Sequence, residues 1–448
     1  MRRKLVLLSM VASALMIVTA AMATPPSFSV TTVALQELSG EPSIAVDASG
    51  TSTNGTIYYI GPGASALFIS TNQGASFTSG PAVQTAGDSD VVVDGVGNVY
   101  TSALLGESGL DTTVPVQTLT PGGASIVRTR YLDPAASGIE CDRQWSAAHL
   151  NGHVATSAEC NEDQVWTTTD GWATVSGPYV ITPGVLSAGP LVYAPNGTLL
   201  QGVEKSDGIY LAKSSNEGHA WTTVKVSSDI GTLHWPVVAA DDSNNLYMVY
   251  SISASNADMS GGGYMVLFTA STDGGSTWGA PRPLSSQIAS PVVGNTPSSI
   301  FPWITGGASG KVAVSWWQAR DPAGGETDLT PDTGLPTTKW DVIVDRSDNA
   351  TAASPTWGIS TAVSGFHTGS ECTLGLACVG PQNLGFVNTP TPFDRRDLDF
   401  FETAISQTGA LYIAYPQDRP QVSTSVGDYL FSWIDFKLAR QTGGSLLR

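Results

Sequence analysis

The sequence is poor in charged residues for its length. Only 13% of its 448 residues are charged, and apolar patterns with the period of a helix are nearly absent. Glycine (48 residues) and proline (27 residues) are plentiful instead. Scarce charge, few amphipathic helices and many turn residues are typical of an all-β protein. Beyond the N-terminus no apolar run is long enough to span a bilayer, so we expect no membrane insertion.

Basic residues are the scarcer of the two charge types. Residues 1–23 combine three basic residues, an apolar core and a small-residue cleavage site, which is the pattern of a cleaved signal peptide. Its removal leaves 20 − 3 = 17 basic against 38 acidic residues, a net charge of −21. This charge disfavours binding to nucleic acid or anionic membranes. We expect a secreted or periplasmic monomer whose mature chain, 24–448, is one domain.

Several catalytic signatures are missing. Histidine occurs five times, and no H-E-x-x-H or paired-histidine spacing indicates zinc. No G-x-S-x-G elbow occurs, and the glycine runs at 261–263 and 274–275 lead into no helix that would bind phosphate. No cofactor is required by these patterns. A ring of acidic residues would suit Ca²⁺, although no contiguous calcium loop is present.

The four cysteines of this exported chain predict two disulfides. Their proximity in sequence favours Cys141–Cys160 and Cys372–Cys378. The hairpin centred on residues 151–152 places Cys141 and Cys160 symmetrically about its turn, so they would face each other across adjacent strands. We expect both bridges to be structural.

Residues 271–278 predict a tight hairpin turn. The Ser271 hydroxyl and the Asp273 carboxylate can cap backbone N–H groups, Gly275 supplies the positive φ, and Trp278 packs under the turn. Looser copies of this S-x-D-x-G-x-x-W order occur at 70–77, 168–172 and 214–221.

This order resembles the Asp box, or BNR repeat, of the sialidase superfamily of β-propellers. The resemblance implies blades of four antiparallel strands repeated radially. A second repeat, an apolar strand followed by a tight turn and another strand, occurs in seven copies. We therefore predict an all-β propeller of seven blades, with six as the alternative because catalytic sialidases have six. A strand at 28–34 is expected to complete the last blade and close the ring, which removes an open edge.

Loop lengths predict which face of the propeller is functional. Turns joining strands 1–2 and 3–4 lie on one face, and 2–3 loops and crossovers lie on the other. The long segments are 2–3 loops at 104–122, 253–263, 320–339 and 417–427, and a crossover insertion at 366–398. All fall on the face opposite the Asp boxes. Long loops gathered on one face of a rigid scaffold are where function usually lies.

The inner strand of each blade starts on that long-loop face, so the residues at those starts ring the mouth of the channel. Glycosidases need two carboxyl groups beside the scissile bond. The candidate catalytic acids are Asp142, Asp399, Glu402 and Asp90. Arg143 would keep its neighbour Asp142 ionised. The candidate substrate contacts are Arg143, His234, Trp235, Trp303, Arg320 and Tyr415.

Two motifs extend the resemblance. Residues 142–145 (D-R-Q-W) are similar to a blade start of bacterial sialidase-like BNR proteins, and residues 399–402 (D-F-F-E) are similar to their last-blade start. The F/Y-R-I-P motif of catalytic sialidases is absent, and Glu41 occupies the region where its arginine would be needed. True sialidase activity is therefore not expected.

Two functional hypotheses follow. The first is a glycoside hydrolase or lyase that acts on an extracellular glycan at the long-loop mouth. It predicts a deep pocket with two carboxyl groups about 5–10 Å apart. The second is a non-catalytic propeller that binds a protein or an extracellular polymer, and it predicts a shallow mouth without such a pair.

Overall fold

The computed structural model describes residues 24–37, 40–64, 66–85, 87–105, 113–134, 141–253, 264–285, 298–320, 338–369, 371, 397, 399–419 and 434–448. The predicted signal peptide at 1–23, the Cys372–Cys378 bridge and most of the predicted insertion at 366–398 lie outside these residues. Within them, no helix has the length and hydrophobicity needed to cross a membrane.

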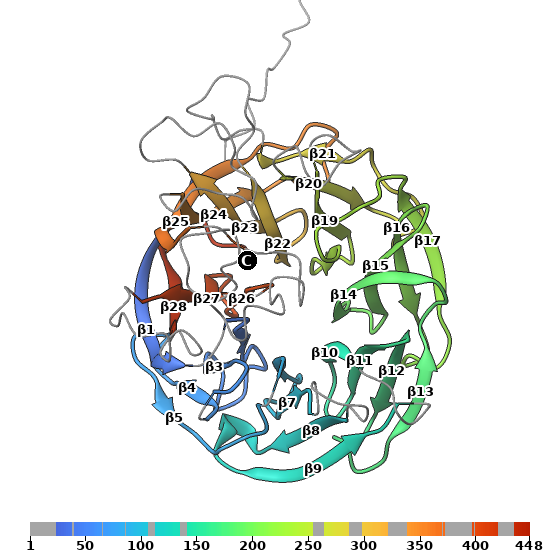
Figure 1. The fold of residues 1–448 in the computed structure, drawn as a ribbon, viewed down its shortest axis with the longest axis vertical. Coiled ribbons are helices and arrows are strands. Elements are labelled where there is room, and N and C mark those ends of the chain that lie inside the picture. Colours follow the sequence, from blue (N-terminus) through green and yellow to red (C-terminus); the bar gives the residue numbers. More distant parts are fainter. Residues whose placement is uncertain are drawn as a thin grey trace, which may run out of the picture.

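The described strands form seven antiparallel sheets of four strands, arranged as the blades of a propeller (Figure 1). Blade 1 contains β2 (Ser43–Val46), β3 (Ile57–Ile60), β4 (Phe68–Ser70) and β5 (Thr78–Ser79). Blade 2 contains β6 (Ser89–Val93), β7 (Val99–Ala103), β8 (Val114–Leu119) and β9 (Ile126–Leu132). Blade 3 contains β10 (Asp142–Ala148), β11 (Val154–Cys160), β12 (Glu162–Thr168) and β13 (Ser176–Val180). Blade 4 contains β14 (Val185–Tyr193), β15 (Leu199–Lys205), β16 (Gly208–Ser214) and β17 (Thr222–Ser227).

Blade 5 contains β18 (Val237–Ala240), β19 (Leu246–Ser253), β20 (Tyr264–Ser271) and β21 (Arg282–Pro283). Blade 6 contains β22 (Ser299–Gly306), β23 (Val312–Arg320), β24 (Lys339–Ser347) and β25 (Gly358–Thr368). Blade 7 contains β26 (Glu402–Ile405), β27 (Leu411–Asp418), β28 (Ile434–Gly443) and, as its outer strand, β1 (Ser27–Glu37). The prediction of seven blades is confirmed.

The N-terminal strand closes the ring as predicted. Strand β1 pairs antiparallel with β28, so that the first and last described strands lie side by side in one sheet (Figure 1). This pairing gives β28 a partner on its outer edge, which would otherwise be open to other chains. The ring is therefore fastened by hydrogen bonds between segments about 400 residues apart.

Three boundaries differ from the sequence-based expectation. Strand β8 lies inside the predicted 104–122 loop, because Pro115 and its polar neighbours conceal an otherwise apolar strand that pairs with β7. The sequence predicts the third strand of blade 7 over 429–437, but β28 continues to Gly443, because β1 pairs with it along that length. Strand β25 runs to Thr368, three residues into the predicted insertion.

The hydrophobic core lies between neighbouring blades. Most clusters of buried apolar side chains join two adjacent blades; one, for example, joins Ile57 of blade 1 to Phe436 of blade 7. Two larger clusters extend over three or four blades. Apart from the aromatic residues described below, the inner strands place few large side chains near the axis of the propeller. The blades therefore form a rigid frame that holds the inner strand starts in place.

Candidate functional site

The turn at 271–278 has the hydrogen bonds that its sequence suggests. The Ser271 hydroxyl accepts a hydrogen bond from the Gly275 N–H at 2.9 Å, and Asp273 Oδ1 accepts one from the Thr277 N–H at 2.9 Å. Gly275 has a φ of +78°, and Trp278 packs against the adjoining core cluster. In the three looser copies, the hydroxyl of a serine or threonine donates a hydrogen bond to the asparagine or aspartate two positions later. These pairs are Ser70–Asn72, Thr168–Asp170 and Ser214–Asn216. These side chains hold 3–4 turns.

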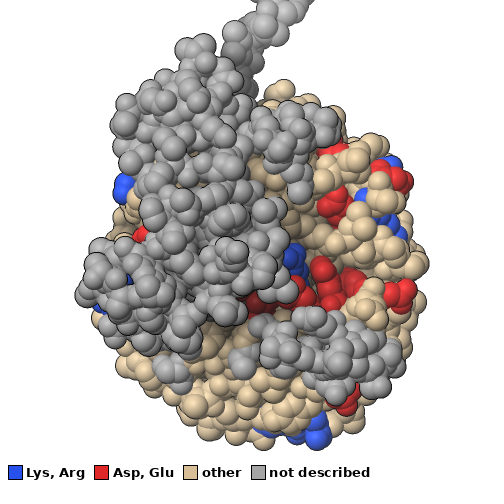
Figure 2. All heavy atoms as spheres, in the orientation of Figure 1, with Lys and Arg blue, Asp and Glu red and all other residues tan. Residues whose placement is uncertain are grey.

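The mouth, where the inner strands begin, gathers charged groups from three blades. Arg143 of blade 3 has its Nε 3.5 Å from Asp142 Oδ2 and its Nη2 3.9 Å from Asp399 Oδ2. His234 at the start of blade 5 places its Nε2 3.3 Å from Asp399 Oδ1. Figure 2 shows acidic side chains gathered beside a basic one near the middle of one face. Four of the predicted site residues are thus brought together.

Arg143 is the positive centre of this group. Burial lowers its pKa, but the negative charges of Glu159, Asp399, Asp142 and Asp88 outweigh that effect and raise the pKa above its usual value. Arg143 is therefore a permanent cation within an acidic ring. It stabilises the ionised form of the carboxylates around it.

The structure adds Glu159 to the mouth, a residue that the sequence analysis missed. Glu159 on β11 is directly opposite Asp142 on β10. Burial raises the pKa of Glu159, although Arg143 and the Ala188 N–H, which donates a hydrogen bond to it at 2.7 Å, act in the other direction. Asp142, in contrast, has a side chain that is 61% exposed. The two opposed carboxyl groups thus have different environments.

A signal in the sequence could have found Glu159. The predicted Cys141–Cys160 disulfide is confirmed, with Cα atoms 4.2 Å apart. Asp142 and Glu159 are the next residues inward from the bridged cysteines, so the Cys141–Cys160 pairing also sets these two residues opposite each other. A register shift between Asp142 and Trp145 makes this pairing differ by one residue from the one that the turn alone would give. The disulfide therefore fixes the register of the carboxyl pair at the open end of the hairpin.

Four residues at the inner strand starts have left-handed backbone without being glycine. They are Glu41 (φ 60°), Arg143 (φ 54°), His234 (φ 66°) and Phe301 (φ 52°). Such conformations cost about 1–3 kcal/mol each for non-glycine residues and cluster at functional sites. Arg143 and Phe301 also coincide with irregularities in the pairing of their strands. The same backbone conformation thus recurs at the inner strand starts of four blades.

Beneath the mouth, four aromatic rings meet on the axis. Trp145, Trp235, Trp303 and Phe400 come from blades 3, 5, 6 and 7. Their ring centroids lie 4.8 Å apart for Trp145–Phe400, 5.3 Å for Trp145–Trp235 and 5.9 Å for Trp145–Trp303. We call this group the aromatic plug. Trp235 and Trp303, expected to contact substrate, are instead 4% and 9% exposed and pack on the other rings of the plug.

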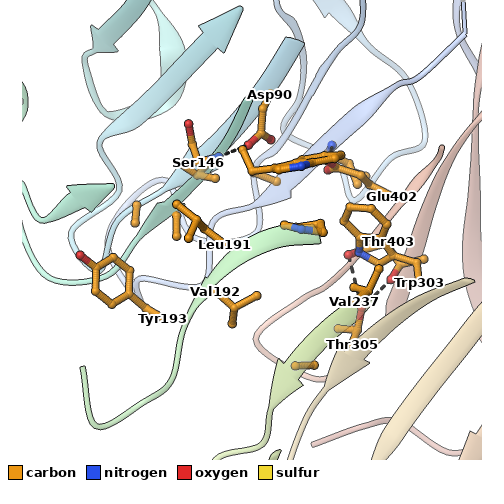
Figure 3. A pocket seen from close by; sticks show the side chains of 18 of the residues that line it. Asp90, Ser146, Leu191, Val192, Tyr193, Val237, Trp303, Thr305, Glu402 and Thr403 are labelled. Carbon is orange, nitrogen blue, oxygen red and sulfur yellow. Dashed lines mark hydrogen bonds between the residues drawn. The ribbon is translucent and has the colours of Figure 1, made fainter. Parts of the chain in front are cut away.

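The plug separates the mouth from a cavity on the axis. Each inner strand runs from the mouth, past the plug, to the 1–2 turns, and its later residues line a cavity of about 340 Å³. Figure 3 shows Asp90, Ser146 and Glu402 along the wall of this cavity. The four predicted catalytic acids therefore fall into two groups: Asp142 and Asp399 lie in the mouth, and Asp90 and Glu402 line the cavity.

Asp90 and Glu402 are held by neighbouring blades. Asp90 accepts hydrogen bonds from the Ser43 hydroxyl of blade 1 at 2.8 Å and from the Ser146 N–H of blade 3 at 2.6 Å. Glu402 of blade 7 accepts one from the Ile44 N–H of blade 1 at 3.0 Å. Burial raises the pKa of Asp90 to about 6, and burial together with the charge of Asp90 raises that of Glu402 well above its usual value.

Two further predicted contact residues do not join the mouth group. Arg320 forms an ion pair with Asp341 across β23 and β24, with Nε–Oδ2 and Nη2–Oδ1 distances of 2.7 and 2.9 Å. Tyr415 is fully buried and packs against Phe366 in the core between blades 6 and 7. A side chain without exposed surface does not suit a ligand contact. Sequence position alone placed both too close to the axis.

No protein-family model and no curated protein matches the chain. Among solved structures, it is similar to YCF48 bound to D1 peptide, with 12% sequence identity, 94% of this chain and 100% of that chain covered, and a TM-score of 0.47. It is also similar to the phage phi92 endosialidase, with 10% identity, 93% and 69% covered, and a TM-score of 0.44. A third is the GH93 α-L-arabinofuranosidase of Fusarium graminearum in complex with arabinobiose, with 12% identity, 93% and 97% covered, and a TM-score of 0.43. At identities of 10–12% the likeness concerns the fold alone.

Proposed function

We propose that this propeller is an exported glycoside hydrolase that acts on glycans at the mouth, with Glu159 as the proton donor and Asp142 as the ionised carboxylate. The observation that carries the proposal is the direct opposition of these two residues on β10 and β11. One is exposed, and the other has a raised pKa. A glycosidase needs such a difference, because one carboxyl group must give a proton while the other stays charged.

The spacing supports this assignment. Directly opposed residues of an antiparallel pair have Cβ atoms about 4.5–5.5 Å apart. Glutamate and aspartate side chains of different length can then present carboxyl groups about 5–10 Å apart, the range of glycosidases. Asp399, held between Arg143 and His234, would flank the bound sugar.

The charge of the rim favours neutral glycans as substrates. Asp142, Glu159, Asp399 and Asp88 surround a single arginine, so an anionic sugar would be repelled. This agrees with the absence of the sialidase F/Y-R-I-P motif. Calcium bound to these acids would add to the affinity for sugar hydroxyls, but the proposed acid–base step does not need it.

The test is a screen of neutral and acidic polysaccharides for released sugar. Glu159→Gln and Asp142→Asn are each expected to reduce the rate by at least about 100-fold, because each removes one proton-transfer or charge-stabilising group. Glu162→Gln is the matched control: Glu162 is exposed on β12 of the same blade and should not change the rate. Sugar release that is equal in the wild type and in Glu159→Gln would contradict the proposal.

A second function is favoured by the aromatic plug. The space bounded by His234, Trp235, Phe301 and Asp399 has a free volume of about 10 Å³, too small for a sugar ring. A space too small for a sugar ring, among the described residues of the mouth, suits a non-catalytic propeller that binds a protein or extracellular polymer on its surface. In that case immobilised glycans or secreted proteins would be retained by the wild type without turnover, and Glu159→Gln would bind as well as the wild type.

A further inference from the structure

A second group of titratable side chains lies away from the mouth, between blades 6 and 7. His367, near the end of β25, is fully buried. Its Nδ1 lies 2.9 Å from Asp397 Oδ2 and 3.4 Å from Asp418 Oδ2, and its Nε2 lies 3.5 Å from Glu371 Oε1. One imidazole thus faces three carboxylates, which come from the end of β25, the approach to blade 7 and the end of β27.

Asp397 is the least satisfied member of this group. Its side chain has no exposed surface, and neither of its carboxylate oxygens accepts a well-oriented hydrogen bond. Burying a carboxylate without hydrogen bonds is costly unless a cation compensates for its charge. The Asp397 backbone packs so closely against Gly40 that a side chain at position 40 would collide with the Asp397 carbonyl group.

We propose that His367 Nδ1, Asp397 and Asp418 bind a divalent transition-metal ion, with Glu371 orienting the imidazole from its other nitrogen. Ligand atoms of His367, Glu371 and Asp397 lie within 4.8 Å of one another. Bonds of about 2.0–2.2 Å to nitrogen and oxygen put neighbouring ligand atoms about 2.9–3.5 Å apart in octahedral or tetrahedral geometry. The two distances from Nδ1 to Asp397 and Asp418 fall in that range.

The arrangement of Glu371 fits the same site. A histidine that binds a metal through one ring nitrogen usually donates its other N–H to a carboxylate, which fixes the tautomer and the ring orientation. Glu371 Oε1 lies 3.5 Å from His367 Nε2, the ring nitrogen that the two aspartates do not contact. An imidazole ligand favours zinc, manganese or iron over calcium, which prefers oxygen ligands. The ion would join blade 6 to blade 7.

In the experiment, the full chain is treated with a chelator and then titrated with zinc chloride, and calorimetry measures the binding and the melting temperature. We expect one equivalent to bind to the wild type and to raise its melting temperature. Asp397→Asn should weaken binding at least about 10-fold, and His367→Ala should abolish it. Asp418→Asn, at a partly exposed position that tolerates substitution more readily, should also weaken binding. Asp418→Asn therefore still tests the proposal if the variants at the buried positions do not fold.

Two controls exclude adventitious binding. His219 is exposed outside this group, so His219→Ala should leave the affinity and stoichiometry unchanged. Calcium chloride at the same concentration should not displace zinc. Absence of stoichiometric binding by the wild type, or an affinity that the Asp418 and Asp397 substitutions leave unchanged, would overturn the proposal. Because Glu159 and Asp142 take no part in this site, its failure would leave the proposed hydrolase untouched.

Discussion

Left-handed backbone serves two purposes at the scale of single residues. In the 3–4 turn, Gly275 adopts it because a side chain would collide with blade 4: a Cβ there would lie 2.4 Å from Leu211 Cδ2 and 3.1 Å from Leu246 Cδ1. At the mouth, Arg143 and His234 adopt it with their side chains present, at a cost in strain. The related turns also hold non-glycine residues in this region, at Gln73, Trp172 and Glu217, so left-handed backbone occurs at both ends of the blades.

Gly275→Ala tests the turn. We expect a loss of about 2–4 kcal/mol in the free energy of unfolding, because the added methyl group meets Leu211 in a left-handed conformation. Gly274→Ala is the matched control: its φ is +67°, and no atom lies within 4 Å of an added Cβ. It should cost only about 1 kcal/mol, from the backbone conformation. Urea denaturation of both variants measures the difference, and equal losses would mean that contact with Leu211 does not matter.

At the scale of elements, the 1–2 turns join neighbouring blades. Asp241 accepts hydrogen bonds within its own turn from Ser243 N–H, Asn245 N–H and the Tyr247 hydroxyl. It accepts another from the Gly310 N–H of blade 6 at 2.7 Å. Asp94 of blade 2 repeats the arrangement with Tyr100 and with the Gly152 N–H of blade 3. The order D-x-x-x-N-x-Y therefore specifies a turn that also binds the next blade.

Asp241→Ala is expected to destabilise the protein by about 3–5 kcal/mol. The substitution leaves the Tyr247 hydroxyl and the Gly310 N–H buried without their acceptor. Asp242→Ala, the adjacent exposed aspartate whose contact is a 3.6 Å ion pair with Arg448, should cost less than about 1 kcal/mol. Chemical denaturation of the two variants compares them. A similar loss in both would refute the role of Asp241 between blades.

At the scale of the whole molecule, hydrogen bonds at the inner strands also close the ring, in addition to the pairing of β1 with β28. Glu402 of blade 7 accepts a hydrogen bond from blade 1, and Asp90 of blade 2 accepts hydrogen bonds from blades 1 and 3. The Asp399 N–H of blade 7 also donates to Glu41 of blade 1 at 2.9 Å. Buried acids thus span the junction where the chain's two ends meet.

The raised pKa of Asp90 makes stability depend on pH. Its pKa is about 6 in the folded protein against 3.8 for an unperturbed group. The folded state therefore binds the proton more tightly, and the stability from Asp90 is full below about pH 4 and is lost as the pH rises through 6. A shift of 6 − 3.8 = 2.2 units corresponds to about 3 kcal/mol.

Asp90→Asn should reduce this dependence, to which Glu402, whose pKa is also raised, contributes as well. In urea denaturation from pH 4 to pH 7, the free energy of unfolding of the wild type is expected to fall by about 3 kcal/mol relative to that of the variant as the pH rises. Asp207→Asn, at an exposed position of blade 4, is the control for general charge effects. A wild-type advantage that stays constant with pH would show that Asp90 keeps an ordinary pKa.

The sequence by itself determined the repeat of the propeller. Each hairpin and turn is specified by residues a few positions apart, so the seven copies, the turn at 271–278 and the Cys141–Cys160 bridge could be predicted from local order. Glu159 could be found only by taking the Cys141–Cys160 bridge as the register, because a shift between Asp142 and Trp145 breaks the register set by the turn.

Only the tertiary structure decided which side chains meet. Arg143, His234 and Asp399 come from three blades, and their contacts depend on how far each inner strand projects toward the axis. The aromatic plug divides the predicted acids into two groups because rings from four blades fill the same space. His367 and Asp418 lie on different blades, and only the packing of one blade on the next brings them together. Distances across blades depend on the closed ring, which no local pattern in the sequence encodes.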